Sequence, residues 1–257
     1  MLKRIITSVI GLPILAAFLF FGGWALAVPV LLIALLGQVE LYRCFGKLKA
    51  VHFAALAAST IFIFSLLFFW DFLYIYLQNY VFIIIGAFLL VISVGSKMHN
   101  AAFSFLYITL PLSAILVMRE GFGLHYVWLI FIGAWGSDTG AYFVGKFLGK
   151  RKLAPTLSPN KTVEGSIGGI VLAAVLSVMY ALVFDFSYAS LALFGIYGAI
   201  AAVLGQSGDL FASAIKRRMG IKDFGGVMPG HGGVLDRFDS ILFVAVFAIA
   251  YFHFLGM

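Results

Sequence analysis

Charged side chains gather in one glycine-rich stretch near the carboxyl end of the sequence, residues 213–239, although only 11% of the 257 residues are charged. Basic groups bind phosphate, carboxylates bind metal ions, and glycines let backbone N–H groups approach phosphate oxygens. This combination predicts a site for a polyphosphate and a metal ion. A solvated loop whose basic residues only set membrane topology is the alternative. The charged residues and the histidine of the stretch are Lys216, Arg217, Arg218, Lys222, Asp223, His231, Asp236, Arg237 and Asp239.

Three aspartates, Asp209, Asp236 and Asp239, are the candidate ligands of a magnesium ion. Asp236 and Asp239 are three residues apart, so they share one face of a helix that has begun by Asp236. Asp209 lies in or near the end of the preceding predicted helix, where a carboxylate is costly in lipid. Mg²⁺ takes one or two carboxylates together with water and substrate phosphates. A second cation, a local lysine paired with Asp209, and helix capping by Asp236 or Asp239 stay open as alternatives.

The same stretch contains candidate anion-binding groups. Ser213 and Lys216 follow Asp209 by four and seven residues, which places them on its face of a helix. His231 precedes a Gly-Gly pair, which favours a sharp turn with exposed N–H groups. The imidazole can donate to a phosphate or assist the departure of a leaving group, and an ordinary loop histidine is the alternative.

Two polar groups upstream are further candidates. Asp138 lies within an apolar predicted helix and should therefore face other helices, as a ligand, a lysine partner or a proton relay. In the stretch 158–165, SPNKTVEG, Lys161 suits a point charge beside a phosphate. Thr162 can place the start of a helix at an anion, and a capping segment without a ligand is the alternative.

The elements that position these groups are predicted to be transmembrane helices. The sequence is 63% hydrophobic with a mean hydropathy of +1.12, which is unlike a soluble domain. Repeated apolar runs of about 20 residues predict an all-α polytopic membrane bundle. We expect one transmembrane domain, 1–257, with mainly scaffold helices in 1–120 and catalytic helices with cytoplasmic loops in 121–257. The predicted spans are 5–22, 24–41, 52–70, 73–94, 101–118, 124–145, 165–184, 189–212 and 240–256.

The loop charges predict how these nine spans are oriented. With the N-terminus in the cytoplasm, every one of the 17 basic residues except Arg119 falls on the cytoplasmic side, as the positive-inside rule requires. Both chemically rich segments then face the cytoplasm. Topology and phosphate binding account for the net charge of +7, so no nucleic-acid partner is predicted. Lys3 and Arg4 before the first apolar run leave a cleaved signal peptide as an alternative, although the run is long for one.

The motifs together resemble a known signature. The patterns S-x-x-K-R from Ser213, K-D from Lys222 and P-x-H-G-G-x-x-D-R-x-D from Pro229 are similar to those of the phosphatidate cytidylyltransferases, the CDP-diacylglycerol synthases. The stretches SDTGAY from Ser137 and SPNKTVEG from Ser158 fit as well. Met228 replaces another apolar residue, and Asn160 replaces a frequent lysine, which removes one phosphate contact. The similarity runs from about residue 136 to the C-terminus.

The resemblance implies transfer of CMP from CTP to phosphatidic acid, giving CDP-diacylglycerol and pyrophosphate. The residues taken alone predict a membrane-embedded, Mg²⁺-dependent enzyme that acts on phosphates at the cytoplasmic face of the lipid bilayer. The compact chain favours a bacterial inner membrane, and similar enzymes suggest a homodimer. The implied catalytic residues are Asp209, Lys216, Arg217, His231, Asp236 and Asp239. The implied substrate-binding residues are Asp138, Ser158, Lys161, Thr162, Glu164, Ser213, Lys222, Asp223, Gly232, Gly233 and Arg237.

Rival functions remain open at this point. A CTP-dependent polyprenol kinase, or a nucleotidyltransferase using another lipid phosphate, would need similar groups. A cation- or proton-coupled transporter would also use intramembrane carboxylates such as Asp138 and Asp209. Against transport, the polar residues cluster on one predicted face and form no track to the other side.

Overall fold

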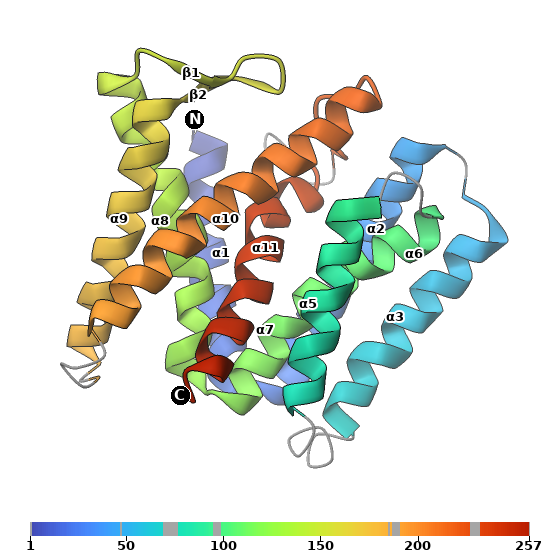
Figure 1. The fold of residues 1–257 in the computed structure, drawn as a ribbon. Coiled ribbons are helices and arrows are strands. Elements are labelled where there is room, and N and C mark those ends of the chain that lie inside the picture. The colour runs from blue at the N-terminus through green and yellow to red at the C-terminus, as the bar shows by residue number, and fades with distance from the viewer. Residues whose placement is uncertain are drawn as a thin grey trace.

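The computed structural model describes residues 2–46, 48–68, 77–94, 99–184, 186, 191–226 and 232–256, which form a helical bundle with one small β-hairpin (Figure 1). The prediction of a mostly helical protein is confirmed, and the hairpin is an addition to it. The helices are α1 (Leu2–Phe21), α2 (Gly23–Phe45), α3 (Ala50–Phe68), α5 (Leu77–Val94), α6 (Asn100–Ser104), the π-helical η2 (Phe105–Thr109), α7 (Leu110–Gly121), α8 (Leu124–Leu148), α9 (Val163–Val183), α10 (Leu191–Arg218) and α11 (Leu235–Phe254); the strands are β1 (Lys152–Ala154) and β2 (Ser158–Thr162).

Among the described residues, five helical segments are long and apolar enough to cross a membrane: Gly23–Phe45, Ala50–Phe68, Asn100–Gly121, Val163–Val183 and Leu191–Arg218. The outer surface of α9 shows why a bilayer is needed, because Ile167, Val171, Val175 and Met179 recur every fourth residue and are all exposed. Such a stripe suits lipid rather than water. The chain is therefore an integral membrane protein of α-helices. The other predicted spans also contain helix, while the number of spans and their orientation remain predictions.

Helices α8, α9, α10 and α11 pack closely because small residues face each other. A Cβ atom added at Gly140 would lie 2.7 Å from the Gly168 carbonyl oxygen, and one at Gly169 would lie 2.6 Å from that of Ser137. Backbone-to-backbone contact of this kind is typical of helix packing in membranes. A Cβ at Gly208 of α10 would likewise lie 2.7 Å from the carbonyl oxygen of Asp239 in α11. The glycines thus bring the polar ends of α10 and α11 together.

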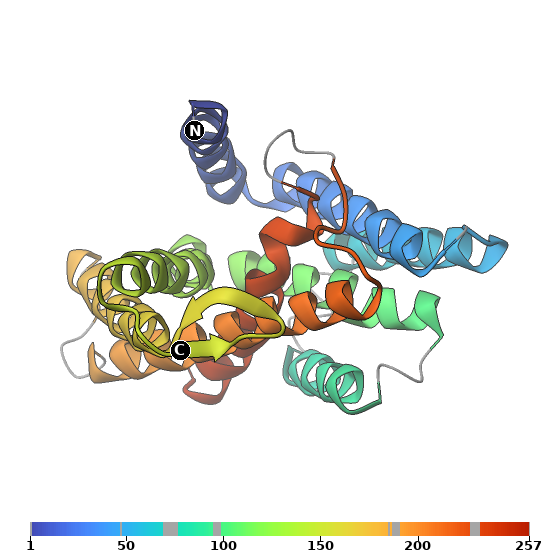
Figure 2. The ribbon, with the colours of Figure 1, turned by 90° about the horizontal axis from the view of Figure 1, so that it is seen from above.

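The hairpin and the polar ends of α10 and α11 lie at the same end of the molecule. Strands β1 and β2 are antiparallel, with Lys152 opposite Thr162 and Ala154 opposite Ser158. Viewed from above, the hairpin lies over this end of the bundle, and β2 contacts both α8 and α9 (Figure 2). The stretch that begins at Ser158 is thereby placed beside the polar end of α10, about fifty residues later in the sequence.

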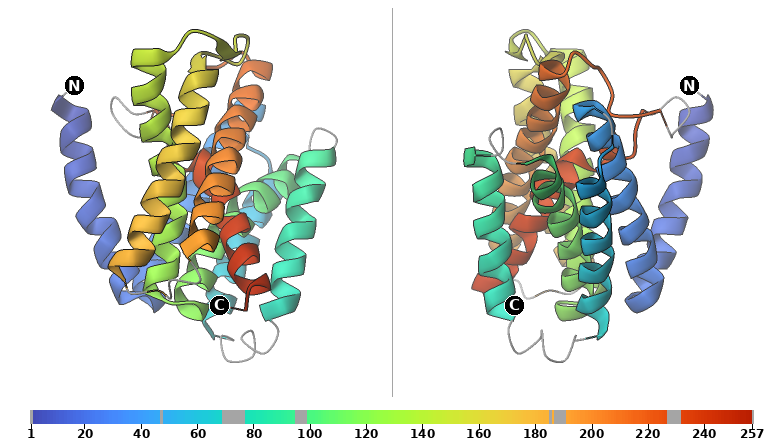
Figure 3. Two further views of the ribbon diagram at one scale, coloured as in Figure 1. Left: turned by 60° about the vertical axis from the view of Figure 1, so that its left-hand side comes forward. Right: turned by 90° about the vertical axis from the view of Figure 1, so that its right-hand side faces the viewer.

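The N-terminal half packs beside this four-helix group, against α8 and α11 (Figure 2). A buried hydrogen-bond network joins three of its helices, since the Gln38 amide nitrogen donates to the hydroxyls of Ser59 and Thr109 at 3.0 Å each. Helix α1 stands at the edge of the molecule (Figure 3). Its corner with α2 is held by Arg119, whose Nε donates to the Leu19 carbonyl at 2.6 Å, and by Glu120, which accepts from the Gly23 N–H at 2.7 Å.

Candidate active site

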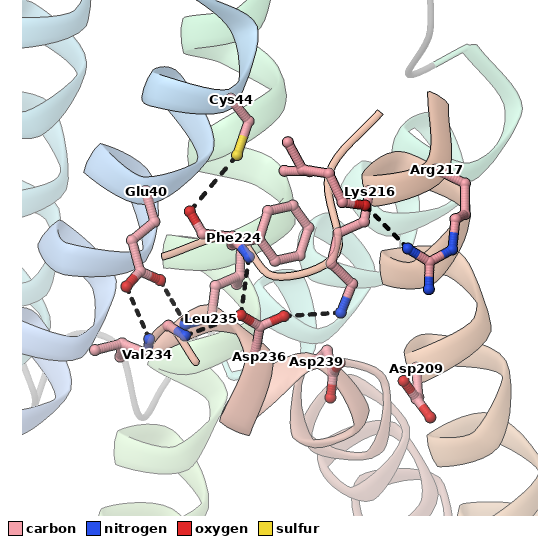
Figure 4. A network of polar contacts seen from close by, with 12 residues as sticks. Glu40, Cys44, Asp209, Lys216, Arg217, Phe224, Val234, Leu235, Asp236 and Asp239 are labelled. Carbon is pink, nitrogen blue, oxygen red and sulfur yellow. Dashed lines mark hydrogen bonds and ion pairs between the residues drawn. The ribbon is translucent and has the colours of Figure 1, made fainter. Parts of the chain in front are cut away.

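Lys216 lies in the last turn of α10 and is buried, with 8% of its surface exposed. Its Nζ donates to Asp236 Oδ1 at 2.7 Å and lies 5.2 Å from the centre of the Phe224 ring (Figure 4). A buried ammonium needs such a partner, because desolvation otherwise penalises its charge. The end of α10 is thereby tied to the start of α11.

Asp236 makes further contacts through its second oxygen. Oδ2 accepts from the backbone N–H of Phe224 and of Gly233, both at 2.9 Å. Gly232 has a φ of 83°, the left-handed region that glycine tolerates, and a Cβ there would lie 3.2 Å from Asp236 Oδ2. Asp236 therefore holds three segments together, and it contacts the turn before its own helix much as a capping residue would.

Asp239 lies one turn further along α11 and is 7% exposed. Its Oδ1 accepts from the N–H of Ser240 at 2.8 Å. Asp239 and Asp209 approach the same space from α11 and α10 (Figure 4). Asp209, Lys216 and Asp138 are all near enough to interact electrostatically with the Asp239 carboxyl group. Asp239 is thus a buried carboxylate in an electrostatic group that draws on three helices.

Asp209 forms an ion pair with Lys161 of β2, and both side chains are about a quarter exposed, at 29% and 25%. The sequence leaves pairing with a local lysine as an alternative for Asp209. The structure does place a lysine there, but it comes from the hairpin instead of from α10. Lys216, which shares the helix of Asp209, pairs with Asp236 instead.

A cavity of about 210 Å³ lies beside Lys161, between the hairpin and helices α8, α9 and α10. Gln206 closes one side of it by donating to the Ser137 hydroxyl at 3.0 Å and to the Ser166 carbonyl at 3.1 Å. Three predicted substrate-binding residues, Asp138, Lys161 and Thr162, are brought together in its wall. The lining residues are Asp138, Ala141, Tyr142, Leu153, Asn160, Lys161, Thr162, Gly165, Ser166 and Gln206.

Several other predicted residues have structural contacts. Thr162 caps α9 by accepting from the Gly165 N–H at 3.1 Å, and Glu164 accepts from the N–H groups of Lys150 and Arg151 at the base of the hairpin. These contacts match the capping alternative for this stretch. Arg217 donates to the carbonyls of Leu157 and Ile221, at 3.3 and 3.0 Å.

The remaining predicted residues differ in their exposure. Ser213 is buried on α10, Ser158 and Gly232 are partly buried, and Gly233 is buried. Lys222, Asp223 and Arg237 are exposed, and the charge of Arg237 acts on Asp138. His231 lies outside the described residues.

Glu40 of α2 is a residue that the sequence analysis missed. It is 3% exposed, and its two carboxylate oxygens accept from the N–H groups of Val234 and Leu235 at 2.9 Å each (Figure 4). The partners are 194 and 195 residues away in the sequence. A lone carboxylate in an otherwise apolar run was the available signal.

The predicted metal ligands Asp209, Asp236 and Asp239 lie on α10 and α11. Within the part of the chain that the structure describes, no group of three His, Cys, Asp or Glu side chains is close enough to hold a metal ion unaided. Asp209 and Asp239 nevertheless approach one space, and an ionised carboxylate has about four acceptor sites. Two carboxylates fit Mg²⁺, because water and substrate phosphates usually complete the coordination of this ion.

Comparisons with known proteins agree with the motifs. The sequence model of the Cytidylyltransferase family matches residues 2–255. The chain belongs to the cytidylyltransferase family. A phosphatidate cytidylyltransferase of Staphylococcus haemolyticus is 35% identical over 94% of this chain and 95% of its own. The resemblance to phosphatidate cytidylyltransferases is confirmed.

Two shorter alignments show higher identity. The phosphatidate cytidylyltransferases of Bacillus subtilis and Staphylococcus saprophyticus are 52% and 48% identical over 130 and 122 residues. In these alignments the chain spans about half the length of its curated relatives, 47% and 46%. Similarity to cytidylyltransferases is thus strongest over about half of the chain.

Proposed function

We propose that this protein transfers CMP from CTP to phosphatidic acid in the membrane, giving CDP-diacylglycerol and pyrophosphate. The observation that carries the proposal is the pair of lysine–aspartate contacts, Lys161 with Asp209 and Lys216 with Asp236, at one end of a lipid-facing helical bundle. Relatives named phosphatidate cytidylyltransferase support the same reaction.

The reaction needs charge neutralisation more than covalent catalysis. A phosphate oxygen of phosphatidic acid attacks the α-phosphorus of CTP, and the bond from that phosphorus to the bridging oxygen of pyrophosphate breaks. The electron pair leaves with pyrophosphate, and the attacking monoester is already ionised, so no enzyme nucleophile is required. Several phosphates meet at one centre, which makes cations and positioning the main requirements.

The two lysines supply such cations in different ways. Lys161 is partly exposed beside the 210 Å³ cavity, so an incoming phosphate can compete with Asp209 for its ammonium. Lys216 is buried and directed by Asp236, so it presents a fixed positive charge. Arg217 joins the hairpin to the end of α10 and thereby fixes the distance between these two lysines.

Asp209 and Asp239, with Asp236 beside them, are the residues that would hold Mg²⁺. When bound, the ion would neutralise phosphate charge and act as a Lewis acid. The buried position of Asp239 restricts water around that charge, which strengthens electrostatic interactions. Asp138 adds a further carboxyl group in the wall of the cavity. A second cation is compatible with this number of carboxylates.

Incubation of the purified protein with CTP labelled at the α-phosphate, Mg²⁺ and phosphatidic acid tests the reaction. We expect the label in a lipid product and pyrophosphate release that depends on phosphatidic acid. A polyprenol kinase would instead move a γ-phosphate label to polyprenol, and replacing phosphatidic acid by other lipid phosphates tests the related transferases. Ion flux into liposomes without nucleotide, with no lipid labelling, would contradict the proposal in favour of transport.

The orientation is part of the proposal. Nine spans with a cytoplasmic N-terminus would put the hairpin and the ends of α10 and α11 in the cytoplasm of a bacterial inner membrane, where CTP is available. A reporter fused after Met257 should then lie outside the cytoplasm, while the same reporter at the N-terminus should lie inside. A cytoplasmic signal from the C-terminal fusion would require one span fewer. A homodimer, and the lack of a nucleic-acid partner, also remain predictions.

A further inference from the structure

A buried carboxylate from the N-terminal half defines the start of α11. The first N–H groups of a helix have no acceptor within the helix, and the helix dipole makes this end partially positive. Glu40 supplies both an acceptor and a negative charge at this end, since its two oxygens accept from the N–H groups of Val234 and Leu235 at 2.9 Å each. Because Glu40 belongs to α2, it links two segments that are 194 and 195 residues apart in the sequence.

The glycines of the signature stretch leave space for this carboxylate. A Cβ added at Gly225 or at Gly233 would lie 2.7 Å from the carboxyl carbon of Glu40, closer than real Cβ atoms approach. Neither glycine has a φ in the left-handed region, so space and not backbone conformation is what excludes a side chain. By contrast, a Cβ at Gly226 would meet nothing within 4 Å.

Two further contacts lie between α2 and the segments that contain Phe224 and Leu235. The Cys44 thiol donates to the Phe224 carbonyl at 3.7 Å, and a Cβ at Gly37 would lie 3.7 Å from a methyl group of Leu235. The carboxyl end of α2 therefore contacts both the segment before the turn and the first turn of α11. Asp236 accepts from the N–H groups of Phe224 and Gly233. Glu40 lies against Gly225 and Gly233, so it contacts the same two segments that orient Asp236.

We propose that Glu40 is a positioning residue for the transfer reaction. By fixing the start of α11, it sets where Asp236 meets Lys216 and where Asp239, one turn later, lies relative to Asp209. It touches neither substrate nor metal in this role. The inference rests on the proposed function for its activity readout, but its structural part does not.

Substitution of Glu40 gives the first test. Glu40→Gln keeps the size and one acceptor oxygen but turns a donor toward the other N–H, so only one of two bonds survives. We expect kcat to fall roughly tenfold to a hundredfold, with a smaller change in KM for CTP and a shifted Mg²⁺ dependence. Glu40→Ala, which loses both bonds, should be worse. Gln38→Ala, on the same helix but in the Ser59–Thr109 network, is the control for simple destabilisation.

The control separates positioning from stability. Gln38→Ala should lower the unfolding temperature while leaving kcat and the Mg²⁺ response unchanged at a temperature where it is folded. If Glu40→Gln behaves in the same way, lowering only the unfolding temperature, then Glu40 is structural and the inference is overturned. An unfolded Glu40 variant does not end the test, because the glycine variants below address the same contact from the other side.

A double-mutant cycle tests the contact itself. Gly225→Ala should reduce both unfolding temperature and kcat because its methyl group meets the Glu40 carboxylate, whereas Gly226→Ala should match the wild type. In a Glu40→Ala background, where the space is free, Gly225→Ala should cause little further loss. Equal losses in both backgrounds would overturn the inference. Should the wild type lack transfer activity, the proposed function fails, yet the cycle can still be read from unfolding temperatures.

Discussion

The two lysine–aspartate pairs join the same residue types at the same end of the molecule, yet they lie in different environments. Lys161 and Asp209 are about a quarter exposed, and Lys161 lines a cavity, whereas the side chains of Lys216 and Asp236 are 10% and 5% exposed. Asp236 also binds two backbone N–H groups. An exposed pair exchanges partners at little cost, while separating a buried pair is expensive. We therefore expect the first pair to take part in substrate capture and the second to hold the ends of α10 and α11 in place.

Asp239 lies near both pairs, and its substitution should have the largest effect. Asp239→Asn keeps the size and one acceptor oxygen but removes the charge that would bind Mg²⁺. We expect the rate to fall on the order of a thousandfold. Initial rates against Mg²⁺ concentration, with folding checked by gel filtration in detergent, measure this. Asp239 lies inside α11, and Asn can still accept the hydrogen bond from the Ser240 N–H, so the variant should fold. A well-folded variant with near wild-type rate and unchanged Mg²⁺ dependence would remove Asp239 from the site. Asp209→Asn and Asp236→Asn would then show whether any metal site survives.

Lys216→Ala breaks the buried pair and should have the next largest effect. It leaves the Asp236 carboxylate without its cation, which costs roughly 3–5 kcal/mol of stability in buried sites. Loss of a fixed charge beside the phosphates should also slow turnover by on the order of a hundredfold. Lys49→Ala removes an exposed positive charge from the early part of the chain and serves as the control. Small and equal effects of the two changes, in turnover and in thermal unfolding, would mean that the cluster only sets topology.

Lys161→Ala breaks the exposed pair and sharpens the comparison. Stability should change by less than about 1 kcal/mol, because a partly exposed pair contributes little. Weaker phosphate binding should nevertheless lower kcat/KM for CTP roughly tenfold. Turnover and unfolding temperature, measured under the same conditions as for Lys216→Ala, compare the exposed pair with the buried pair. A large loss of stability with unchanged kcat/KM would reverse the roles of the two pairs.

The sequence predicted the elements better than it predicted their partners. Long apolar runs identify helices because lipid forces backbone groups into internal hydrogen bonds. The ends are harder to place: α10 runs to Arg218, beyond the predicted end at 212, and α11 begins at Leu235, before the predicted start at 240. Both extensions favour the predicted grouping, since Asp209 and Lys216 lie on one helix and Asp236 and Asp239 on another.

The contacts across the chain could not be predicted. The pairing of Lys161 with Asp209 depends on a hairpin whose strands of three and five residues have no alternating pattern in the sequence. The contact of Glu40 with the start of α11 depends on how α2 packs against it. Residues 1–120 were expected to be mainly scaffold, and Glu40 shows that this scaffold reaches the site.

The length of α10 relates the site to the depth of the bilayer. Its 28 residues span roughly 42 Å, whereas the hydrocarbon core is about 30 Å thick. Such a helix must tilt or protrude, and its three final basic residues indicate which end emerges into the headgroup region. Asp209 lies nine residues, or about 13 Å, from that end, so its depth in the bilayer follows from how far α10 protrudes. We therefore expect acyl-chain length in the surrounding membrane to affect how deeply Asp209 is immersed, which would make bilayer thickness a variable of the proposed reaction.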